Sequence, residues 1–319
     1  MSDTMAAPSS SPPSSPGNTP LGRVIIDPYP TTSLEFRYKN LQQCIDDISS
    51  AMTSFTDGSR ADGSWMIFSG VDERAFEDIS NSENAILSIC SKFFNPTGNL
   101  LIFKMESLWH STTTMAVTRW IDRTAHAMNV ESEMLITGTG IHKLSVLDED
   151  GRPSVSEGSV STIQKKADQT IYPFTCPTSR PMKWPSFVLE VTYTEQRARV
   201  QEDMRLWLRA TEGQVEFAMT ASVQPTSKRI TLEQWELKPQ PTRDHPKRLI
   251  AHPVQKMWIQ KPRQTGQKPI VGGRFEIPFR SIFLREPQGS EADFLMTNEE
   301  IERIARDVWR VDTIIDANR

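Results

Sequence analysis

The sequence predicts a mixed α/β fold in which helices flank a central mixed sheet, and consecutive patterns in one segment lead to that prediction. Residues Ser186–Val191 form a short apolar run that is typical of a buried strand. Residues Gln196–Thr211 place apolar side chains at helical spacing, so they predict an amphipathic helix. Residues Gln214–Val223 alternate with the period of two that a strand requires, and Arg229–Trp235 supplies the next strand.

The rest of the chain shows weaker patterns of the same two kinds. Helical spacing predicts helices at Ser33–Phe55, Ala75–Phe94, Ser111–Asn129 and from Thr297 onward. Apolar runs or alternation predict strands at Ser64–Phe68, Asn99–Met105, Ile141–Leu147 and Phe275–Phe283. The last helix begins with a capping box, in which Thr297 and Glu300 satisfy backbone donors at the helix start.

Composition divides the chain into three parts. Residues 1–33 form a tail rich in Ser and Pro, which cannot bury enough apolar surface to offset its ordering entropy and is predicted to be disordered. Its first part lacks the apolar core of a secretory signal. Residues 34–98 predict a helical extension that packs on the core. Residues 99–319 predict the core itself, with an irregular insertion rich in proline and basic side chains at about 238–269.

Charge and composition exclude several classes of protein. The longest apolar runs are far shorter than the roughly 18 residues that a bilayer span needs, so we expect no membrane partner. The 36 basic and 40 acidic side chains give a net charge of -4, so any contact with nucleic acid must come from a local patch. The three cysteines lack metal or redox spacing, which predicts a reduced intracellular protein of the cytoplasm or nucleus. The sequence has no glycine-rich loop of the kind that binds phosphate groups, so we expect no small-molecule cofactor. The oligomeric state stays open.

Two acidic residues stand out by their positions. Asp168 directly precedes the run Ile171-Tyr172-Pro173, and Glu190 interrupts the apolar strand at Ser186–Val191. A carboxylate inside such a strand is costly unless it is paired, exposed or bound to a cation. Alternation places Glu190 on the opposite face from Leu189, and on a sheet covered on one side only that face is wet. Two carboxylates on adjacent strands form a hard-oxygen site suited to Mg²⁺ or Mn²⁺, which activates water against a phosphodiester.

The segment Lys165–Trp235 resembles the core of the PD-(D/E)XK, or restriction-endonuclease-like, superfamily. Ala167-Asp168 stands where that family has Pro-Asp, and Glu190 stands where it has the second acid, before the helix and strand in the expected order. The passage Pro185–Glu195 is also similar to a set of uncharacterised fungal proteins that are related to Uma-type predicted endonucleases. The resemblance covers about residues 99–310 and implies a restriction-endonuclease-like fold with a metal-dependent nuclease site.

Three positions depart from the pattern that the resemblance implies. Ala167 replaces the family's proline, and Thr192 occupies the place of the lysine expected two residues after the second acid. Uma-type relatives carry a His-Glu pair on an early helix, and the matching place here is His110-Ser111, which lacks the carboxylate. One hypothesis is that another cation reaches in from elsewhere to replace the missing lysine, and the candidates are Lys165, Lys166 and Arg205.

These considerations give a defined set of expected site residues. Asp168, Glu190 and Lys166 are the predicted catalytic residues, and Asp168 and Glu190 are the predicted ligands of Mg²⁺ or Mn²⁺. The predicted contacts to nucleic acid are basic side chains of the same segment: Lys165, Lys166, Arg197 and Arg199. The basic and aromatic segment Asp244–Lys261 can track a nucleic-acid backbone, although a charged surface segment is the commoner explanation of such a pattern.

Three functions remain open at this point. The first is a divergent metal-dependent nuclease. The second is a catalytically inactive module of the same fold that binds nucleic acid or protein. The third is an unrelated interaction protein, in which Asp168 is a strand-end residue, Glu190 lies on the exposed face of an edge strand and Lys165-Lys166 is a solvated pair. The distance between the two carboxylates and the presence of a third charged group beside them separate these hypotheses.

Overall fold

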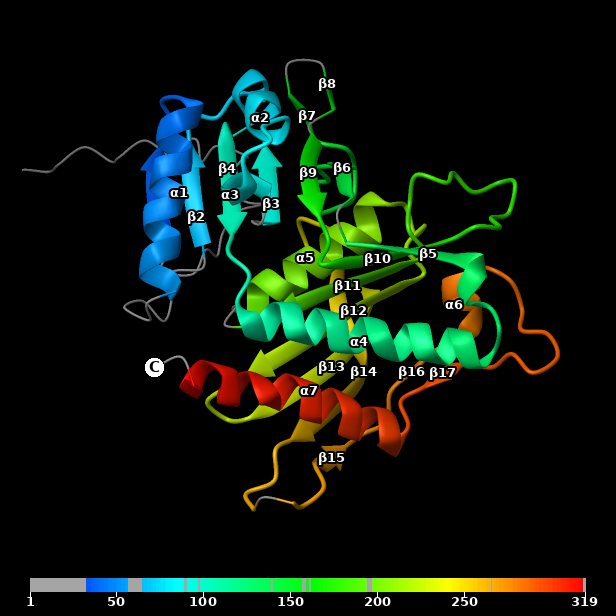
Figure 1. The fold of residues 1–319 in the computed structure, drawn as a ribbon. Coiled ribbons are helices and arrows are strands. Elements are labelled where there is room, and N and C mark those ends of the chain that lie inside the picture. Colours follow the sequence, from blue (N-terminus) through cyan, green and yellow to red (C-terminus); the bar gives the residue numbers. More distant parts are fainter. Residues whose placement is uncertain are drawn as a thin grey trace, which may run out of the picture.

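The computed structural model describes residues 33–56, 65–88, 91–96, 98–138, 140–156, 159–160, 162–193, 197–264 and 266–317. The tail predicted at residues 1–33 lies outside the described residues apart from Ser33. Within the described ranges the fold is mixed α/β, with two main sheets and helices packed against them (Figure 1). None of the described helices is long and apolar enough to cross a membrane.

The larger sheet has seven strands in the order β15-β14-β13-β12-β11-β10-β5. These strands are β5 (Met134–Thr137), β10 (Gln169–Pro173), β11 (Phe187–Thr192), β12 (Phe217–Gln224), β13 (Arg229–Pro239), β14 (Leu249–Gln260) and β15 (Ile270–Gly272). Strands β11 and β12 are parallel, and the other neighbouring pairs are antiparallel. Two parallel neighbours need a crossover connection, and α5 (Arg197–Ala210) makes it.

The smaller sheet has six strands in the order β1-β2-β4-β3-β9-β6. These strands are β1 (Leu34–Arg37), β2 (Trp65–Ser69), β3 (Ser91–Asn95), β4 (Leu100–Lys104), β6 (Ile141–Ser145) and β9 (Thr162–Lys166). Strand β9 pairs with β3 and β6, and it leads through Ala167 and Asp168 directly into β10 of the larger sheet. This two-residue connection therefore joins the two sheets.

Helices cover both faces of the larger sheet (Figure 1). The described helices are α1 (Leu41–Thr56), α2 (Glu73–Ser80), α3 (Ala85–Ser88), α4 (Leu108–Ala127), the 3-10 turn η2 (Glu131–Glu133), α5, α6 (Phe279–Phe283) and α7 (Asn298–Ala317). Helices α4 and α7 lie side by side on one face, and α5 lies on the other face, between the two sheets. Two short antiparallel strand pairs complete the described fold: β7 (Val155–Ser156) with β8 (Ser159–Val160), and β16 (Glu276–Ile277) with β17 (Phe294–Leu295).

Alternation along β11 divides the apolar core between the two faces of the larger sheet. Leu189 and its odd-numbered apolar neighbours belong to the cluster under α4 and α7, whereas Val188 belongs to the cluster around α5. Trp207 of α5 packs in the same cluster as Trp65 of β2 and Trp235 of β13. Because those two strands belong to different sheets, α5 packs against both sheets at once.

The predicted helix at Ala75–Phe94 is wrong in its second half. Helical structure is limited to α2 and the single turn α3, and the end of the segment forms β3, which pairs with β4 in a hairpin. A short apolar run such as Phe93-Phe94 fits a helix or a strand equally well, and pairing with β4 and β9 decides it. The boundary expected between residues 98 and 99 falls inside this hairpin, so residues 34–98 contribute strands to a sheet in addition to helices.

The irregular insertion predicted at 238–269 contains the long strand β14. Proline is normally excluded from the middle of a sheet because it cannot donate a ladder hydrogen bond. Here Pro253 pairs with Trp235 where the register shifts by one residue, and a bulge of this kind tolerates proline. The strand predicted at Phe275–Phe283 is limited to β16, and α6 forms the rest.

Both helices with clear end signals are confirmed. Helix α5 ends at Ala210, and Gly213 adopts the positive φ of 76° that the predicted Glu212-Gly213 stop requires. At the start of α7, the Thr297 hydroxyl accepts a hydrogen bond from Glu300 N at 3.3 Å. The Glu300 carboxylate pairs with Arg123 of α4 instead of closing the capping box, so this residue joins two helices.

The aromatic centre of the larger core gives the first testable prediction. Phe217 is 1% exposed and lies between the rings of Phe187 at 5.9 Å and Phe275 at 6.3 Å. The substitution Phe217→Ala leaves a cavity, so we expect the free energy of unfolding in urea to fall by about 3–5 kcal/mol. Phe174 is 58% exposed, and Phe174→Ala is the control, with an expected change within about 0.5 kcal/mol. Similar losses in both variants would contradict this packing.

Candidate functional site

Asp168 lies at the connection between the two sheets and is 9% exposed. Its Oδ2 accepts a hydrogen bond from Val191 N at 2.6 Å, and His110 Nε2 lies 2.9 Å from the same oxygen. Val191 follows Glu190 directly, and β10 pairs with β11 from Gln169 and Leu189 onward. The fold therefore places the two predicted acids on neighbouring antiparallel segments, with Asp168 just before β10 and Glu190 within β11.

Glu190 lies on the face of β11 that α5 covers. The face predicted to be wet is closed, because the sheet is covered on both sides, and Glu190 is only 8% exposed. Its Oε1 accepts a hydrogen bond from Trp207 Nε1 at 2.6 Å and lies 3.0 Å from Lys165 Nζ. A buried carboxylate is tolerated only when it is paired and hydrogen-bonded, and Glu190 meets both conditions.

Lys165 connects Glu190 to a second ion pair. Its Nζ also lies 3.3 Å from Asp203 Oδ1, and Asp203 contacts Arg199 one turn earlier on α5, with both distances from the guanidinium at 3.3 Å. The side chains of Lys165 and Arg199 are 8% and 6% exposed. Residues of β9, β11 and α5 thus form one buried chain of alternating charges at the boundary of the two sheets.

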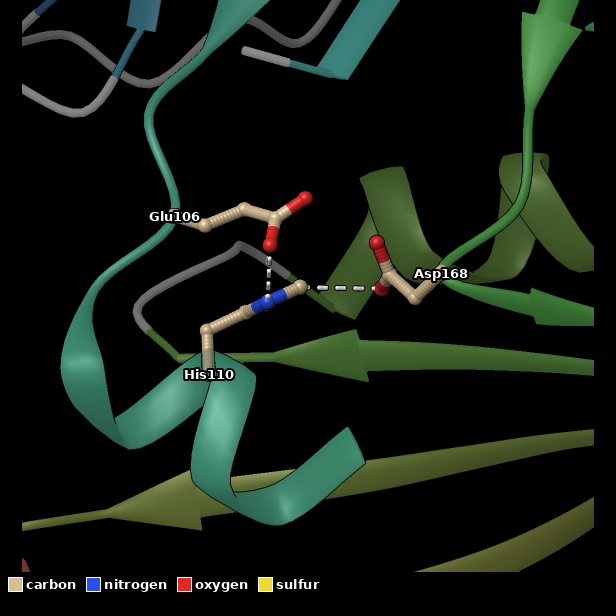
Figure 2. A group of neighbouring side chains, drawn as sticks. All are labelled: Glu106, His110 and Asp168. Atoms are coloured by element: carbon tan, nitrogen blue, oxygen red, sulfur yellow. Dashed lines mark hydrogen bonds and ion pairs between the residues drawn. The ribbon is translucent and has the colours of Figure 1, made fainter. Parts of the chain in front are cut away.

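A second group of charges lies at the start of α4. His110 is in the first turn of this helix, and its ring lies between Glu106 and Asp168 (Figure 2). Asp168 contacts Nε2, whereas Glu106 Oε2 lies 3.7 Å from Nδ1, which is an ion-pair distance and too long for a hydrogen bond. Each carboxylate therefore lies next to a different nitrogen of the imidazole.

The electrostatics follow from this pairing. Burial by itself lowers the pKa of His110, but the charge and hydrogen bond of Asp168, together with Glu106, outweigh burial and raise the pKa to about 9. Burial would raise the pKa of Asp168, yet His110 and Lys104 hold it well below its usual range. Burial raises the pKa of Glu190 to about 7, because the pull of Lys165 is opposed by the charges of Asp168 and Asp203. Asp168 is thus a permanent anion, and Glu190 gains or loses a proton near neutrality.

Charges of both signs are matched in this cluster. Lys104 takes part by donating from Nζ to the Val191 carbonyl at 3.1 Å, and it acts electrostatically on His110, Asp168 and Asp203. The cluster contains four acidic groups, Glu106, Asp168, Glu190 and Asp203, and four basic groups, Lys104, His110, Lys165 and Arg199. The described part of the site is therefore balanced without any added cation.

Glu106, His110 and Asp168 can also be considered as metal ligands, since one atom of each lies within 4.8 Å of the others. Two features oppose that use of His110. The two carboxylates contact opposite nitrogens of the ring, and a single imidazole offers only one nitrogen to one ion. A raised pKa also keeps His110 protonated, and only the neutral ring ligates a metal. The geometry is that of an imidazolium held between two carboxylates.

The predicted basic residues have different locations. Lys165 is in the charge cluster, whereas Lys166, the predicted catalytic lysine, is the next residue of β9 and its side chain points to the opposite face. Arg205, the remaining candidate, pairs with Glu202 on its own helix. The lysine that pairs with Glu190 and Asp203 is therefore Lys165, and the catalytic role of Lys166 stays a prediction for a side chain on the opposite face of β9.

The side chains predicted to contact nucleic acid lie in different environments. Lys165 and Arg199 are buried in ion pairs, so neither is placed to contact a phosphate at the surface. Arg197 is half exposed, lies over the ring of Trp235 at 4.3 Å and pairs with the buried carboxylate of Glu233. Sequence spacing does not distinguish a buried ion pair from a surface cation, and only the tertiary partners do so.

Several members of the cluster were not foreseen from the sequence. Thr192, in the place where the resemblance implies a lysine, donates from Oγ1 to Ser222 Oγ at 2.6 Å and is bound within the sheet. The carboxylate missing at Ser111 has a counterpart in Glu106, which precedes the helix by two residues. A pair of His and Glu four residues apart at a helix start is a visible signal, but Asp203 on α5 has no signal beyond its neighbour Arg199.

Comparisons with known proteins assign no function to the chain, so the functional assignment depends on the geometry of this site. No protein-family model matches the chain, and no curated protein matches it.

The raised pKa of His110 gives a prediction about stability. A pKa that is higher in the folded state than the usual 6.5 contributes stability below about pH 6.5, and that stability is lost as the pH rises through about 9. We expect His110→Gln to lower the free energy of unfolding at pH 6 by at most about 3 kcal/mol, and by much less at pH 9.5. Urea unfolding of both proteins at several pH values measures this difference.

His126→Gln is the matched control for that experiment. His126 lies on the same helix, but its side chain is 76% exposed and it pairs with Glu131 at the surface. A surface ion pair contributes at most about 1 kcal/mol. An effect of His110→Gln that is the same at pH 6 and pH 9.5 would show that the His110–Asp168 pair is not charged.

Proposed function

We propose that the chain is a divergent metal-dependent nuclease-like protein that acts on phosphodiester bonds through Asp168, Glu190 and Lys165. One observation carries the proposal: Lys165 Nζ lies 3.0 Å from Glu190 Oε1, on the strand that leads into Asp168. Two acids on adjacent strands, with an ammonium paired to the second acid, are the groups that this chemistry requires. The lysine comes from β9, and it replaces the one expected at Thr192 on β11.

The arrangement of strands supports the same proposal. The order β10, β11, α5, β12 and β13 agrees with the resemblance of Lys165–Trp235 to the PD-(D/E)XK superfamily. The departures at Ala167 and Ser111 are of less weight in this setting. Ala167 is buried at 1% exposure, and a carboxylate is present at Glu106 beside the position where Ser111 lacks one. The nuclease-like function therefore rests on the site and on the chain order together.

The acid pair suits a small hard cation in its chemistry. Asp168 remains ionised, and Glu190, with a pKa of about 7, provides a second carboxylate oxygen at neutral pH. Asp168 and Glu190 would hold Mg²⁺ or Mn²⁺, which supplies an activated water and positive charge at the reacting phosphate. The buried Lys165 ammonium would add positive charge beside Glu190, while Val191 N and His110 orient the Asp168 carboxylate. A nucleic-acid substrate also agrees with a location in the cytoplasm or nucleus.

A second candidate function is favoured by the charge balance of the cluster. Each of the four acids has a basic partner within the chain, and most of these side chains are buried. Neutral, buried ion networks also occur as structural features without catalysis. On this alternative the chain is a catalytically inactive module of the same fold that binds nucleic acid or protein, and its acids hold the two sheets together.

Cleavage assays with matched lysine variants test the first proposal. We expect Mg²⁺- or Mn²⁺-dependent cleavage of DNA or RNA to fall by roughly a hundredfold or more in Asp168→Asn, Glu190→Gln and Lys165→Met. Lys166→Met changes the neighbouring residue on the other face of β9, and we expect it to retain the activity of the parent chain. Gel assays at neutral pH measure the rates, and thermal unfolding of each variant confirms that it is folded.

The outcomes separate the two candidates. Equal cleavage by the parent chain and by Asp168→Asn identifies a contaminating nuclease and refutes the catalytic proposal. A folded parent chain that never cleaves supports the inactive module. In that case we also expect Mn²⁺ to leave the melting temperature unchanged, because a cation stabilises a protein only when it binds the folded state. A Mn²⁺-dependent increase that is absent in Asp168→Asn would contradict the inactive module.

A further inference from the structure

A basic pocket lies outside the acid cluster, at the edge of the larger sheet. It has a volume of about 530 Å³, and the residues that line it are Ser227, Lys228, Gln260, Lys261, Pro262, Arg263 and Ile270. Three of these side chains are cations, Gln260 offers an amide, and Ile270 is 56% exposed. A surface with cations and apolar contacts side by side suits a ligand that has phosphates and bases.

The strand register places this pocket at the same end of the sheet as the acids. Strand β11 runs parallel to β12, so its last residue, Thr192, pairs with Ser222 near the end of β12. The turn that contains Lys228 follows β12, and Lys261 N donates to the Lys228 carbonyl at 2.9 Å where β14 ends. The carboxyl ends of β11, β12 and β14 therefore lie along one edge, with Glu190 at one side and the cations at the other.

The two lysines have defined positions. Lys228 Nζ lies 2.6 Å from Asp312 Oδ1, and Lys261 Nζ lies 2.8 Å from Asp312 Oδ2, so both amines share one carboxylate of α7. Their side chains remain 40% and 37% exposed. With Arg263, the pocket has three positive charges against the single negative charge of Asp312. The excess positive charge attracts an anion.

Packed aromatic rings connect the pocket to the acid cluster. Lys228 Nζ lies 5.6 Å from the ring centre of Trp109, and Lys261 Nζ lies 6.0 Å from that of Trp309. The two rings meet edge to face at 5.9 Å. Trp109 directly precedes His110, so the turn of α4 that contacts Asp168 also contacts the basic pocket. The two sites are held by the same rigid helix.

We infer that the pocket formed by Lys228, Lys261 and Arg263 binds the sugar-phosphate backbone of a nucleic acid whose continuation reaches the Asp168–Glu190 edge. This inference rests on the proposed function, for which it supplies a substrate-binding surface. From β11 to β14 there are three strand spacings of about 4.8 Å, or roughly 14 Å. At about 3.4 Å of helix axis per nucleotide of one strand, this distance corresponds to about four stacked nucleotides. Contacts of this kind fix the position of a nucleic acid without reading its sequence.

Salt-dependent binding tests the inference without requiring cleavage. Fluorescence anisotropy of a short labelled DNA duplex and of an RNA strand, both in EDTA, gives the binding constant at several KCl concentrations. A lost phosphate contact reduces the slope of log K against log salt by roughly 0.7–0.9. We expect Arg263→Gln to reduce the slope by this amount and to weaken binding several-fold. Lys261→Gln should have the same effect. Thermal unfolding of this variant checks that the protein stays folded when Asp312 loses one of its two lysine partners.

Arg280→Gln is the matched control, because Arg280 is a surface cation on α6, at the far end of the sheet (Figure 1). Its side chain is 68% exposed, and we expect unchanged binding. Equal losses in Arg263→Gln and Arg280→Gln, or no binding by the parent chain at low salt, would overturn the inference. Competition by poly-glutamate as effective as that by DNA would also overturn it, in favour of an acidic protein partner. If the chain binds nucleic acid through this pocket but never cleaves it, the proposed nuclease activity is refuted and the binding inference stands.

Discussion

The ion pair between Lys165 and Glu190 is the interaction on which the relation of the two sheets depends. Lys165 belongs to the smaller sheet, Glu190 belongs to the larger one, and their contact at 3.0 Å is almost completely buried. Removing one partner of such a pair leaves an uncompensated buried charge, which costs about 3–5 kcal/mol. The pair therefore requires the additional partners that surround it, Asp203 for the lysine and Trp207 Nε1 for the carboxylate. Together they fix β9 against β11 and determine where Asp168 lies.

Helix α5 makes this arrangement possible because it is buried from two sides. Met204 and Trp207 pack with side chains of both sheets, while Asp203 and Arg199 on the same helix provide the charges that the cluster needs. A helix with an apolar stripe and charged neighbours normally turns its charges to solvent. In α5 the smaller sheet covers that side, so charges that belong to a surface helix by pattern become internal. The closed face of Glu190 has the same cause.

The sequence predicts some helices and strands well and others poorly, because some carry strong local signals and others form only through tertiary pairing. Strands β11, β12 and β13 and helices α5 and α7 carry strong local signals, namely periodicity and the end signals at Gly213 and Thr297, and they are found where expected. Strand β3 is an ambiguous apolar run, and β14 contains a proline that only a bulge accommodates, so tertiary pairing decides both. Glu190 is visible in the sequence because it interrupts an apolar strand, and Asp168 is visible because it directly precedes another strand-like run. Lys165 and Lys166 cannot be distinguished until the facing sheet is known, since the two residues point to opposite faces of β9.

The charge balance of the cluster bears directly on the choice between catalysis and structure. A divalent cation beside Asp168 and Glu190 would meet the positive charges of His110 and Lys165 at short range, and like charges in a medium of low polarity repel strongly. The least costly response is the release of a proton from His110, whose pKa of about 9 depends on the unshared charge of Asp168. Protonation of His110 and occupation by a metal are thus competing ways to neutralise the same carboxylate. The histidine between Glu106 and Asp168 neutralises these acids without a metal, and a metal at the proposed site would have to displace its proton.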